Sequence, residues 1–369
     1  MSPETAAPQS TPEVPLDLGD VDASWLTAAL SPALGRLRVG AVEVVPITDG
    51  VGLVGQVGRI VPTYDQAPDD APGELILKMP TADPAIRGFA AGMGMYEREG
   101  RFYAEVAPLV TDVSLPRVLF NVCDPAHDQY CILMEKLEIA RTISQHDGVT
   151  IDHAAEIIGT IARLHATWFD HPKLDEWAWL PRPSHPVNKS LTPRFARAWP
   201  HFLEHHAQHV PAEAVGWVEE FAGKMDDWWD GKDHAPYTLV HGDFRLDNMV
   251  WTPGDDLVLL DWQIVQAGFG LYDIAYFIIT NLSVDDRRKA EDQLLDQWRT
   301  TLLDSGANPG SAEEVHRLYR ETVLFWTTGV TCATAEFGAT PEGRALVDML
   351  LERSFTAAAD LCVGEVMPG

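Results

Sequence analysis

Two aspartates and an asparagine lie close together in the second half of the chain. The segment His241-Gly-Asp-Phe-Arg-Leu-Asp-Asn248 contains Asp243 and Asn248, and the apolar run 257–260 ends on Asp261. Phosphoryl transfer needs a carboxylate that orients and deprotonates the attacking hydroxyl, and it needs a carboxamide and a second carboxylate that hold Mg²⁺ on the phosphates. We therefore predict Asp243 as the catalytic base, and Asn248 and Asp261 as the magnesium ligands.

Short apolar segments must position these three side chains. Residues 237–240 and 249–251 flank the polar loop, and 257–260 has the pattern of a buried strand that ends in a carboxylate. Charged groups at the ends of apolar strands are costly unless they bind something. The alternative is that the two aspartates are turn or capping residues, but the whole constellation at this spacing favours a phosphate and metal site.

A second group of candidate residues lies in the N-terminal third. Gly50, Gly52 and Gly55 belong to a glycine-rich stretch that enters a strand-like run, and glycine lets backbone N–H groups close over phosphates. Such glycines are also common in hairpins. The strand 74–79 that follows carries Lys78, a lone cation in an apolar run, which is either a phosphate ligand or an edge-strand lysine that reaches solvent.

A glutamate on the next predicted helix, 95–103, would hold this lysine. Glu97 and Glu99 are both candidates from the residues alone. Gly100 in the middle of the helix is unfavourable, because glycine costs about 1 kcal/mol relative to alanine there.

Together these motifs resemble the kinase signature in which His-x-Asp-x-x-x-x-Asn is followed by a metal-binding aspartate. They are more similar to the aminoglycoside phosphotransferase and choline kinase superfamily than to protein kinases, since His-Gly-Asp replaces His-Arg-Asp and Asp261-Trp-Gln replaces Asp-Phe-Gly. The chain most resembles the ecdysteroid kinase-like branch, because of Gln263 and the motif Tyr272-Asp-Ile-Ala-Tyr276.

The resemblance adds roles that the residues alone do not fix. It implies that Glu99, shortly before Phe102-Tyr103, is the partner of Lys78. It implies a hinge at Glu135 and Leu137, whose backbone meets the nucleotide base. It also implies that Asp273 accepts backbone hydrogen bonds from the catalytic loop, and that helices of the C-terminal part surround the acceptor substrate.

The order of elements predicts an α+β, two-lobed, protein-kinase-like fold with a strand-rich N-lobe and a helical C-lobe. We expect a disordered, proline-rich tail over 1–20, an N-lobe over 21–135 and a C-lobe over 136–369. His165, beside the apolar stripe of the helix 151–169, is expected to be a buried structural histidine. The other predicted helices are 22–30, 195–209, 212–229, 272–281, 285–304, 312–335 and 341–361.

Composition limits the possible partners. The 27 basic and 55 acidic residues give a net charge of −28, which repels nucleic acid and anionic membranes. The charge either attracts a cationic substrate or forms a solvated, salt-adapted surface. The chain shows no signal peptide and no apolar run of the roughly 20 residues that span a bilayer, and its four cysteines lack metal-site spacing. We therefore expect a cytoplasmic protein.

Two further patterns lie between residues 168 and 229. Trp168, Trp177, Trp179, Trp199, Trp217, Trp228 and Trp229 would either line a pocket for an apolar or cationic acceptor or fill a helical core. His201, His205 and His209 recur every four residues, and they would either bind a metal ion or form a polar helix face.

These observations predict an ATP-dependent small-molecule O-phosphotransferase that moves the γ-phosphate to an acceptor hydroxyl, with ATP and Mg²⁺ as cofactors. One alternative is a kinase of another specificity, such as an antibiotic-inactivating, choline-like or sugar kinase. The other is a nucleotide-binding, pseudokinase-like module without catalysis. The acceptor and the oligomeric state remain open.

Overall fold

A computed structural model describes residues 12–47, 54–234, 236–337 and 340–368 and divides the chain into two compact units. The first unit extends to residue 109 and continues over 115–138, and the second consists of 110–114 and 139–369. The segment 110–114 belongs to the second unit because Ser114 pairs with Val258 and its carbonyl accepts a hydrogen bond from the amide of Leu259.

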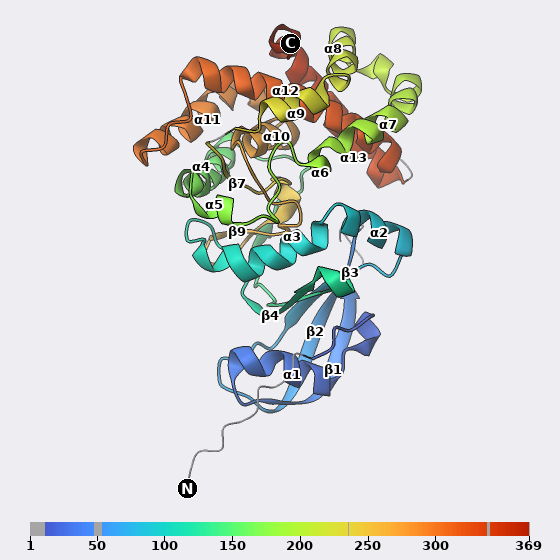
Figure 1. Ribbon diagram of the computed structural model, residues 1–369, viewed down its shortest axis with the longest axis vertical. Coiled ribbons are helices and arrows are strands. Elements are labelled where there is room, and N and C mark those ends of the chain that lie inside the picture. The colour runs from blue at the N-terminus through green and yellow to red at the C-terminus, as the bar shows by residue number, and fades with distance from the viewer. Residues whose placement is uncertain (1–11, 48–53, 235, 338–339, 369) are drawn as a thin grey trace. The chain divides into compact units, whose positions relative to one another are not determined.

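The first unit is built on a five-stranded antiparallel sheet in the order β1-β2-β3-β5-β4. Figure 1 labels β1, β2, β3 and β4 of this sheet. Its strands are β1 (Arg38–Ile47), β2 (Gly55–Gln66), β3 (Leu75–Pro80), β4 (Val118–Asp124) and β5 (Gln129–Glu135). Helix α1 (Ala23–Leu34) covers the sheet, with Leu26 and Leu30 packed in one core with Leu77 and Leu133.

The chain before α1 is ordered where the structure describes it, so the predicted disorder of residues 1–20 is wrong for residues 12–20. Asp17 and Asp20 form a reciprocal capping box on a 3₁₀ turn, Leu18–Asp20. Leu18 is 7% exposed and packs into the core of the sheet. The prolines of this segment indicated a flexible tail, but one buried leucine between two capping aspartates anchors it.

Two short helices follow β3, namely α2 (Pro84–Gly92) and α3 (Met95–Arg101), and α3 continues as a π-helical turn, Phe102–Val106. Gly100 lies within α3, and a β-carbon there would be 2.9 Å from Cβ of Cys123 on β4. The carbonyl of Gly100 also accepts a hydrogen bond of 2.7 Å from the side chain of Asn121. Glycine is therefore present because helix and strand touch.

The second unit is mainly helical, as predicted (Figure 1). Its helices are α4 (Ile151–Trp168), α5 (Lys173–Glu176), α6 (Pro186–Lys189), α7 (Leu191–His205), α8 (Ala212–Ala222), α9 (Met225–Gly231), α10 (Leu271–Asn281), α11 (Val284–Asp304), α12 (Ala312–Glu336) and α13 (Pro341–Asp360). Its short strands are β6 (Arg141–Thr142), β7 (Thr238–Val240), β8 (Met249–Trp251), β9 (Leu257–Leu259) and β10 (Gln266–Gly268).

These short strands form two small sheets that carry the motif residues. One sheet pairs β10 with β7, and the other has the order β6-β8-β9. The predicted single helix 212–229 is instead two helices, because the chain turns at Gly223 and Lys224, where the amide of Lys224 bonds to the carbonyl of Phe221.

Most of the tryptophan-rich region fills this helical core. Trp168, Trp177, Trp228 and Trp229 are buried, and Trp228 and Trp229 both pack on Phe325 of α12. Trp179, Trp199 and Trp217 remain partly exposed. For the four buried rings, the structure therefore agrees with the core interpretation.

The close contact at Gly100 gives a test of the fold. Gly100→Ala should lower the thermal unfolding midpoint, because overpacking at such a contact costs about 1–3 kcal/mol and outweighs the higher helix propensity of alanine. The matched control is Gly216→Ala, on the exposed side of α8 with open space around it, which should leave the midpoint equal or slightly higher. Calorimetry of both variants measures this. Equal midpoints would show that the contact with Cys123 relaxes at no cost.

Candidate active site

A buried carboxylate, that of Asp273, holds the start of the loop 241–248 in the second unit. After β7, the backbone amides of His241 and Gly242 donate hydrogen bonds of 2.8 and 2.9 Å to the two oxygens of Asp273 on α10. Asp273 is fully buried and lies 3.2 Å from Nε2 of His165. These are the backbone hydrogen bonds that the resemblance implied for Asp273.

His165 is a structural histidine, as predicted. Its Nδ1 accepts a hydrogen bond of 3.0 Å from the indole N–H of Trp298. Because an indole nitrogen can only donate, Nδ1 carries no proton, and the proton of the neutral ring lies on Nε2, where it is donated to Asp273. Three N–H groups therefore donate hydrogen bonds to the carboxylate of Asp273, which is buried away from water.

The glycine of His-Gly-Asp has a steric cause. Gly242 has a φ of +91°, in the left-handed region that side chains rarely adopt, and a β-carbon there would lie 2.4 Å from the carbonyl oxygen of Ile264. No other residue fits this turn without moving the chain. Gly242 thus allows the loop to approach the segment after Asp261.

His241 links the two halves of the motif, a role that the sequence analysis did not assign. The ring is fully buried, its Nε2 donates a hydrogen bond of 2.9 Å to the carbonyl of Leu260, and its Nδ1 accepts one of 3.3 Å from the amide of Asp243. The ring also packs on Trp262, with centroids 4.6 Å apart. One neutral imidazole therefore holds Asp243 against the residue that precedes Asp261.

Asp243 and Asn248 are in direct contact. The Asn248 amide nitrogen donates hydrogen bonds of 2.9 Å to both the carbonyl and the carboxylate of Asp243. The backbone carbonyl of Asn248 accepts a hydrogen bond of 2.9 Å from the amide of Leu260, which brings Asp261 next to this pair. Asp261 has a φ of +61°, a strained conformation typical of functional sites, and Gln263 donates to its carboxylate at 3.3 Å.

This donor set fits a magnesium ion. The side-chain nitrogen of Asn248 is bound to Asp243, so the side-chain oxygen of Asn248 is the atom that could bind a cation. Carboxylate and carbonyl oxygens are the ligands that Mg²⁺ prefers, with only one or two carboxylates from the protein. Asn248 and Asp261 are therefore suitable ligands by their chemistry.

Arg245 is a second site residue that the sequence analysis missed. Its Nε lies 3.1 Å from the carboxylate of Asp243 and its Nη1 lies 3.0 Å from that of Asp247. The Asp243 carboxylate raises the pKa of Arg245 although burial opposes this. The spacing of Asp243 and Arg245 is a weak signal in the sequence, because side chains two residues apart face each other only in a turn.

The loop is also fixed from behind. The side chain of Asn281 accepts a hydrogen bond of 3.0 Å from the amide of Leu246, and Asp247 accepts one of 3.0 Å from the amide of Gln145. The buried Arg353 of α13 donates to the backbone carbonyls of Gln145, His146 and Thr280 at 2.8 to 3.0 Å. Helix α10 therefore holds the loop 241–248 directly, and α13 supports it through the segment at Gln145.

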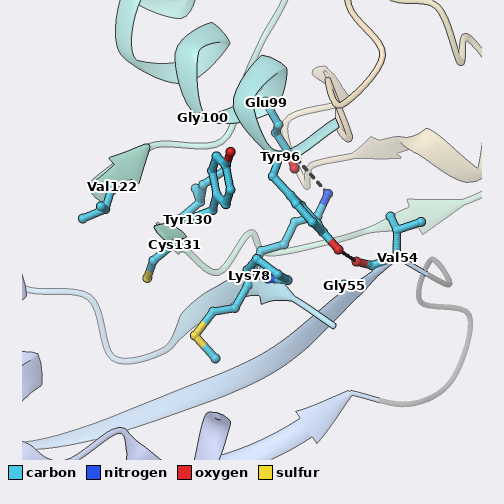
Figure 2. Close-up of a pocket in the computed structure, with 12 residues that line it drawn as sticks. Val54, Gly55, Lys78, Tyr96, Glu99, Gly100, Val122, Tyr130 and Cys131 are labelled. Carbon is cyan, nitrogen blue, oxygen red and sulfur yellow. Dashed lines mark hydrogen bonds and ion pairs between the residues drawn. The ribbon is translucent and has the colours of Figure 1, made fainter. Parts of the chain in front are cut away.

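In the first unit, Lys78 of β3 and Glu99 of α3 form an ion pair with an Nζ–Oε1 distance of 2.8 Å. Glu97, the other candidate, pairs with Arg101 instead. Figure 2 shows Lys78 and Glu99 at the wall of a pocket, where the hydroxyl of Tyr96 donates a hydrogen bond to the carbonyl of Val54.

The remaining nucleotide-site predictions have mixed outcomes. Gly55 lines the same pocket, whereas Gly50 and Gly52 lie outside the described residues. Glu135 ends β5, with its amide bonded to the carbonyl of Arg117, and Leu137 follows it half-buried. Contact of these two residues with a nucleotide base stays a prediction.

The histidine face does not form a metal site in the part of the chain that the structure describes. His201 and His205 are adjacent on α7, with ring centroids 4.5 Å apart, but His209 lies on a separate 3₁₀ turn. Among the described residues, no three His, Cys, Asp or Glu side chains are placed to hold a metal ion together.

Hydropathy gives one further observation. Within the described ranges, every helix is either too short or too polar to pass through a bilayer.

The chain is similar in sequence to one family of kinases and in structure to several solved kinases. Residues 52–307 match the sequence model of the ecdysteroid kinase-like family. Among solved structures, the chain is similar to choline kinase from Cryptosporidium parvum, with a TM-score of 0.55 and 10% identity over 89% of this chain and 92% of that one. It is also similar to macrolide 2′-phosphotransferase from Brachybacterium faecium, with a TM-score of 0.50 and 16% identity over 89% and 97%. These likenesses show a kinase-like fold.

Curated relatives match over short stretches only. A probable acyl-CoA dehydrogenase of Arabidopsis thaliana is 40% identical over 58 residues, which is 14% of this chain and 7% of that protein. Acyl-CoA dehydrogenase family member 11 of Pongo abelii is 27% identical over 123 residues, which is 33% of this chain and 14% of that protein. The chain thus spans a small part of the length of these relatives.

The contacts of Asp273 give a testable prediction. Asp273→Ala leaves the amides of His241 and Gly242 and the imidazole N–H of His165 buried without an acceptor, at a cost of about 1–3 kcal/mol each. Hydrogen exchange at residues 241–243 should accelerate and the unfolding midpoint should fall. Asp292→Ala, at an exposed position on α11, should change neither. Unchanged exchange in Asp273→Ala would mean that other contacts hold the turn.

Proposed function

Because the chain belongs to the ecdysteroid kinase-like family, we propose that it transfers the γ-phosphoryl group of ATP to a hydroxyl of a small molecule. The observation that carries this proposal is the contact of Asp243 with Asn248, beside Asp261 at the end of β9. A base and two oxygen ligands for Mg²⁺ are the groups that this reaction needs, and here one hydrogen-bonded network joins them.

In this proposal, the second unit handles the acceptor. Asp243 orients the acceptor hydroxyl and accepts its proton as the acceptor oxygen forms its bond to the γ-phosphorus. The bond from that phosphorus to the bridging oxygen breaks, and its electron pair leaves with ADP. Asn248 and Asp261 would hold Mg²⁺, which neutralises charge on the phosphates when bound. Positioning supplies most of the rate, because the protein does little covalent chemistry.

The first unit would bind the nucleotide. Lys78, oriented by the buried Glu99, grips the phosphates, and a lysine in this position acts as a point charge. Gly55, which lines the same pocket as Lys78, would lie against the phosphates. The backbone at Glu135 and Leu137 meets the base.

Other functions receive less support from the site. A nucleotide-binding module without catalysis has no need of Asp243, Asn248 and Asp261 together. A choline kinase and a macrolide phosphotransferase share the fold, but fold alone does not fix the acceptor. The net charge of −28 is compatible with a cationic acceptor.

Loss of the base is the direct test. Asp243→Asn should reduce turnover by about 10²- to 10⁴-fold, the usual contribution of general acid–base catalysis. ADP release is measured with a coupled assay over a panel of choline, glucose, kanamycin, erythromycin and cholesterol. Asp256→Asn, an exposed position in the β8–β9 turn, removes a carboxylate outside the site and should leave turnover unchanged. Near-normal turnover in Asp243→Asn would refute its role as base.

Magnesium dependence tests the metal ligands separately. In the wild-type protein, Mg²⁺ should tighten ATP binding, and Asp261→Asn should remove most of that gain, because it loses the charged ligand that links the protein to the phosphates through the ion. Calorimetric titration of ATP with and without Mg²⁺ measures the difference, with Asp256→Asn again as control. An equal magnesium effect in Asp261→Asn would move the metal site elsewhere.

A further inference from the structure

A stacked aromatic pair lies at the surface of the second unit. The rings of Tyr276 on α10 and Trp326 on α12 have centroids 4.2 Å apart and planes 25° from parallel. The indole N–H of Trp326 donates a hydrogen bond of 2.9 Å to the carbonyl of Tyr272, which fixes its orientation. Both rings are partly exposed, whereas Trp228 and Trp229 are buried. The pair is thus a rigid aromatic surface that is open to contact.

The pair is connected to the catalytic carboxylate within the same unit. The side-chain amide of Gln145 donates a hydrogen bond of 3.0 Å to the hydroxyl of Thr280, one turn after Tyr276 on α10, and its oxygen accepts a long one of 3.5 Å from Arg245, which holds Asp243. Gln145 therefore links the helix of Tyr276 to the residues that hold Asp243.

We propose that Tyr276 and Trp326 form the surface on which the acceptor alcohol packs, so that its hydroxyl faces Asp243. This inference rests on the phosphotransferase function proposed above. It makes the two aromatic residues specificity determinants, and it gives Gln145 the role of a positioning residue between the pair and Arg245.

The local charges restrict the class of acceptor. The guanidinium of Arg245 faces two carboxylates, Asp243 and Asp247, so one negative charge is in excess beside the pair. Aromatic faces bind apolar groups and cations, and the excess charge disfavours anions. The acceptor is therefore an uncharged or cationic alcohol, and sugar phosphates and hydroxy acids are excluded.

A partly exposed tryptophan elsewhere provides a matched control. Trp199 on α7 stacks on Phe195 and Phe202, and its indole N–H donates to Glu219 at 3.3 Å. It belongs to the tryptophan-rich segment in which the sequence analysis placed a possible acceptor pocket, and these three partners lie on α7 and α8. Trp326 and Trp199 thus represent the two competing locations.

The experiment compares Trp326→Ala, Trp326→Phe and Trp199→Ala on the alcohol of the panel that the wild-type protein turns over fastest, with glucose 6-phosphate and glycerate added as anionic probes. Trp326→Ala should raise the KM for the acceptor about tenfold or more and leave the KM for ATP unchanged, the pattern of lost ground-state binding. Trp326→Phe should recover part of this loss, which separates stacking from a folding defect. Trp199→Ala should change neither constant.

Three results would overturn the inference or its basis. An unchanged acceptor KM in Trp326→Ala, or an increase in Trp199→Ala alone, would place the acceptor elsewhere and leave the phosphotransferase function intact. Fastest turnover of an anionic probe would contradict the acceptor class. Absence of Asp243-dependent ADP release with every alcohol would refute the proposed function itself, and this inference would fall with it.

Discussion

The buried carboxylate of Asp273 is the interaction on which the catalytic loop depends. Two backbone amides and the N–H of a neutral histidine surround it, so its charge is stabilised by hydrogen bonds from His241, Gly242 and His165. Removing such a charge from water is expensive, and the cost is offset only when the donors are held in place. Trp298 fixes the proton of His165, and the left-handed turn at Gly242 presents the amides. The direction of Asp243 follows from that turn.

A chain of short contacts then connects this loop to Asn248 and Asp261, the proposed metal ligands. His241 bonds to both Asp243 and Leu260, and the backbone of Asn248 also bonds to Leu260. The loop that carries Asp243 and the segment after β9 that carries Asp261 therefore hold each other. The first unit uses the same principle at smaller scale, since the close approach of α3 to β4 at Gly100 places Glu99 beside Lys78. In both units, a glycine permits a backbone contact that positions a charged side chain.

Much of this arrangement could be predicted from the sequence, because the motif residues lie on strongly periodic segments. The helix around His165 has a clear apolar stripe, the helix around Asp273 is apolar along almost its whole length, and the strand of Lys78 stands out by its single cation. Features that depend on distant contacts could not be predicted. Gly100 is unfavourable in a helix, and the reason for it is visible only from its contact with Cys123. The anchoring of Leu18 depends on a sheet whose strands lie further along the chain.

The same limit applies to the site. Side-chain chemistry predicted Asp243, Asn248 and Asp261 as site residues, and the structure brings Asp243 and Asn248 into contact. The linking role of His241 could not be predicted, because it depends on which backbone carbonyl its ring contacts. The density of tryptophan in residues 168–229 suggested a ligand pocket, yet Trp228 and Trp229 pack on Phe325, which lies about a hundred residues away in sequence. Composition shows that aromatic rings gather, whereas burial decides whether a ligand can reach them.

The position of Arg353 has a consequence for how the protein folds. Its guanidinium binds the carbonyls of Gln145 and His146, across sequence separations of 208 and 207 residues, and burial lowers its pKa. Closing so long a loop is entropically costly, and contacts of this kind form late in folding. We therefore expect the contacts of Arg353 to form after those within the helices that precede α13. During refolding, helical content would return before phosphotransferase activity, because activity requires the docking of α13.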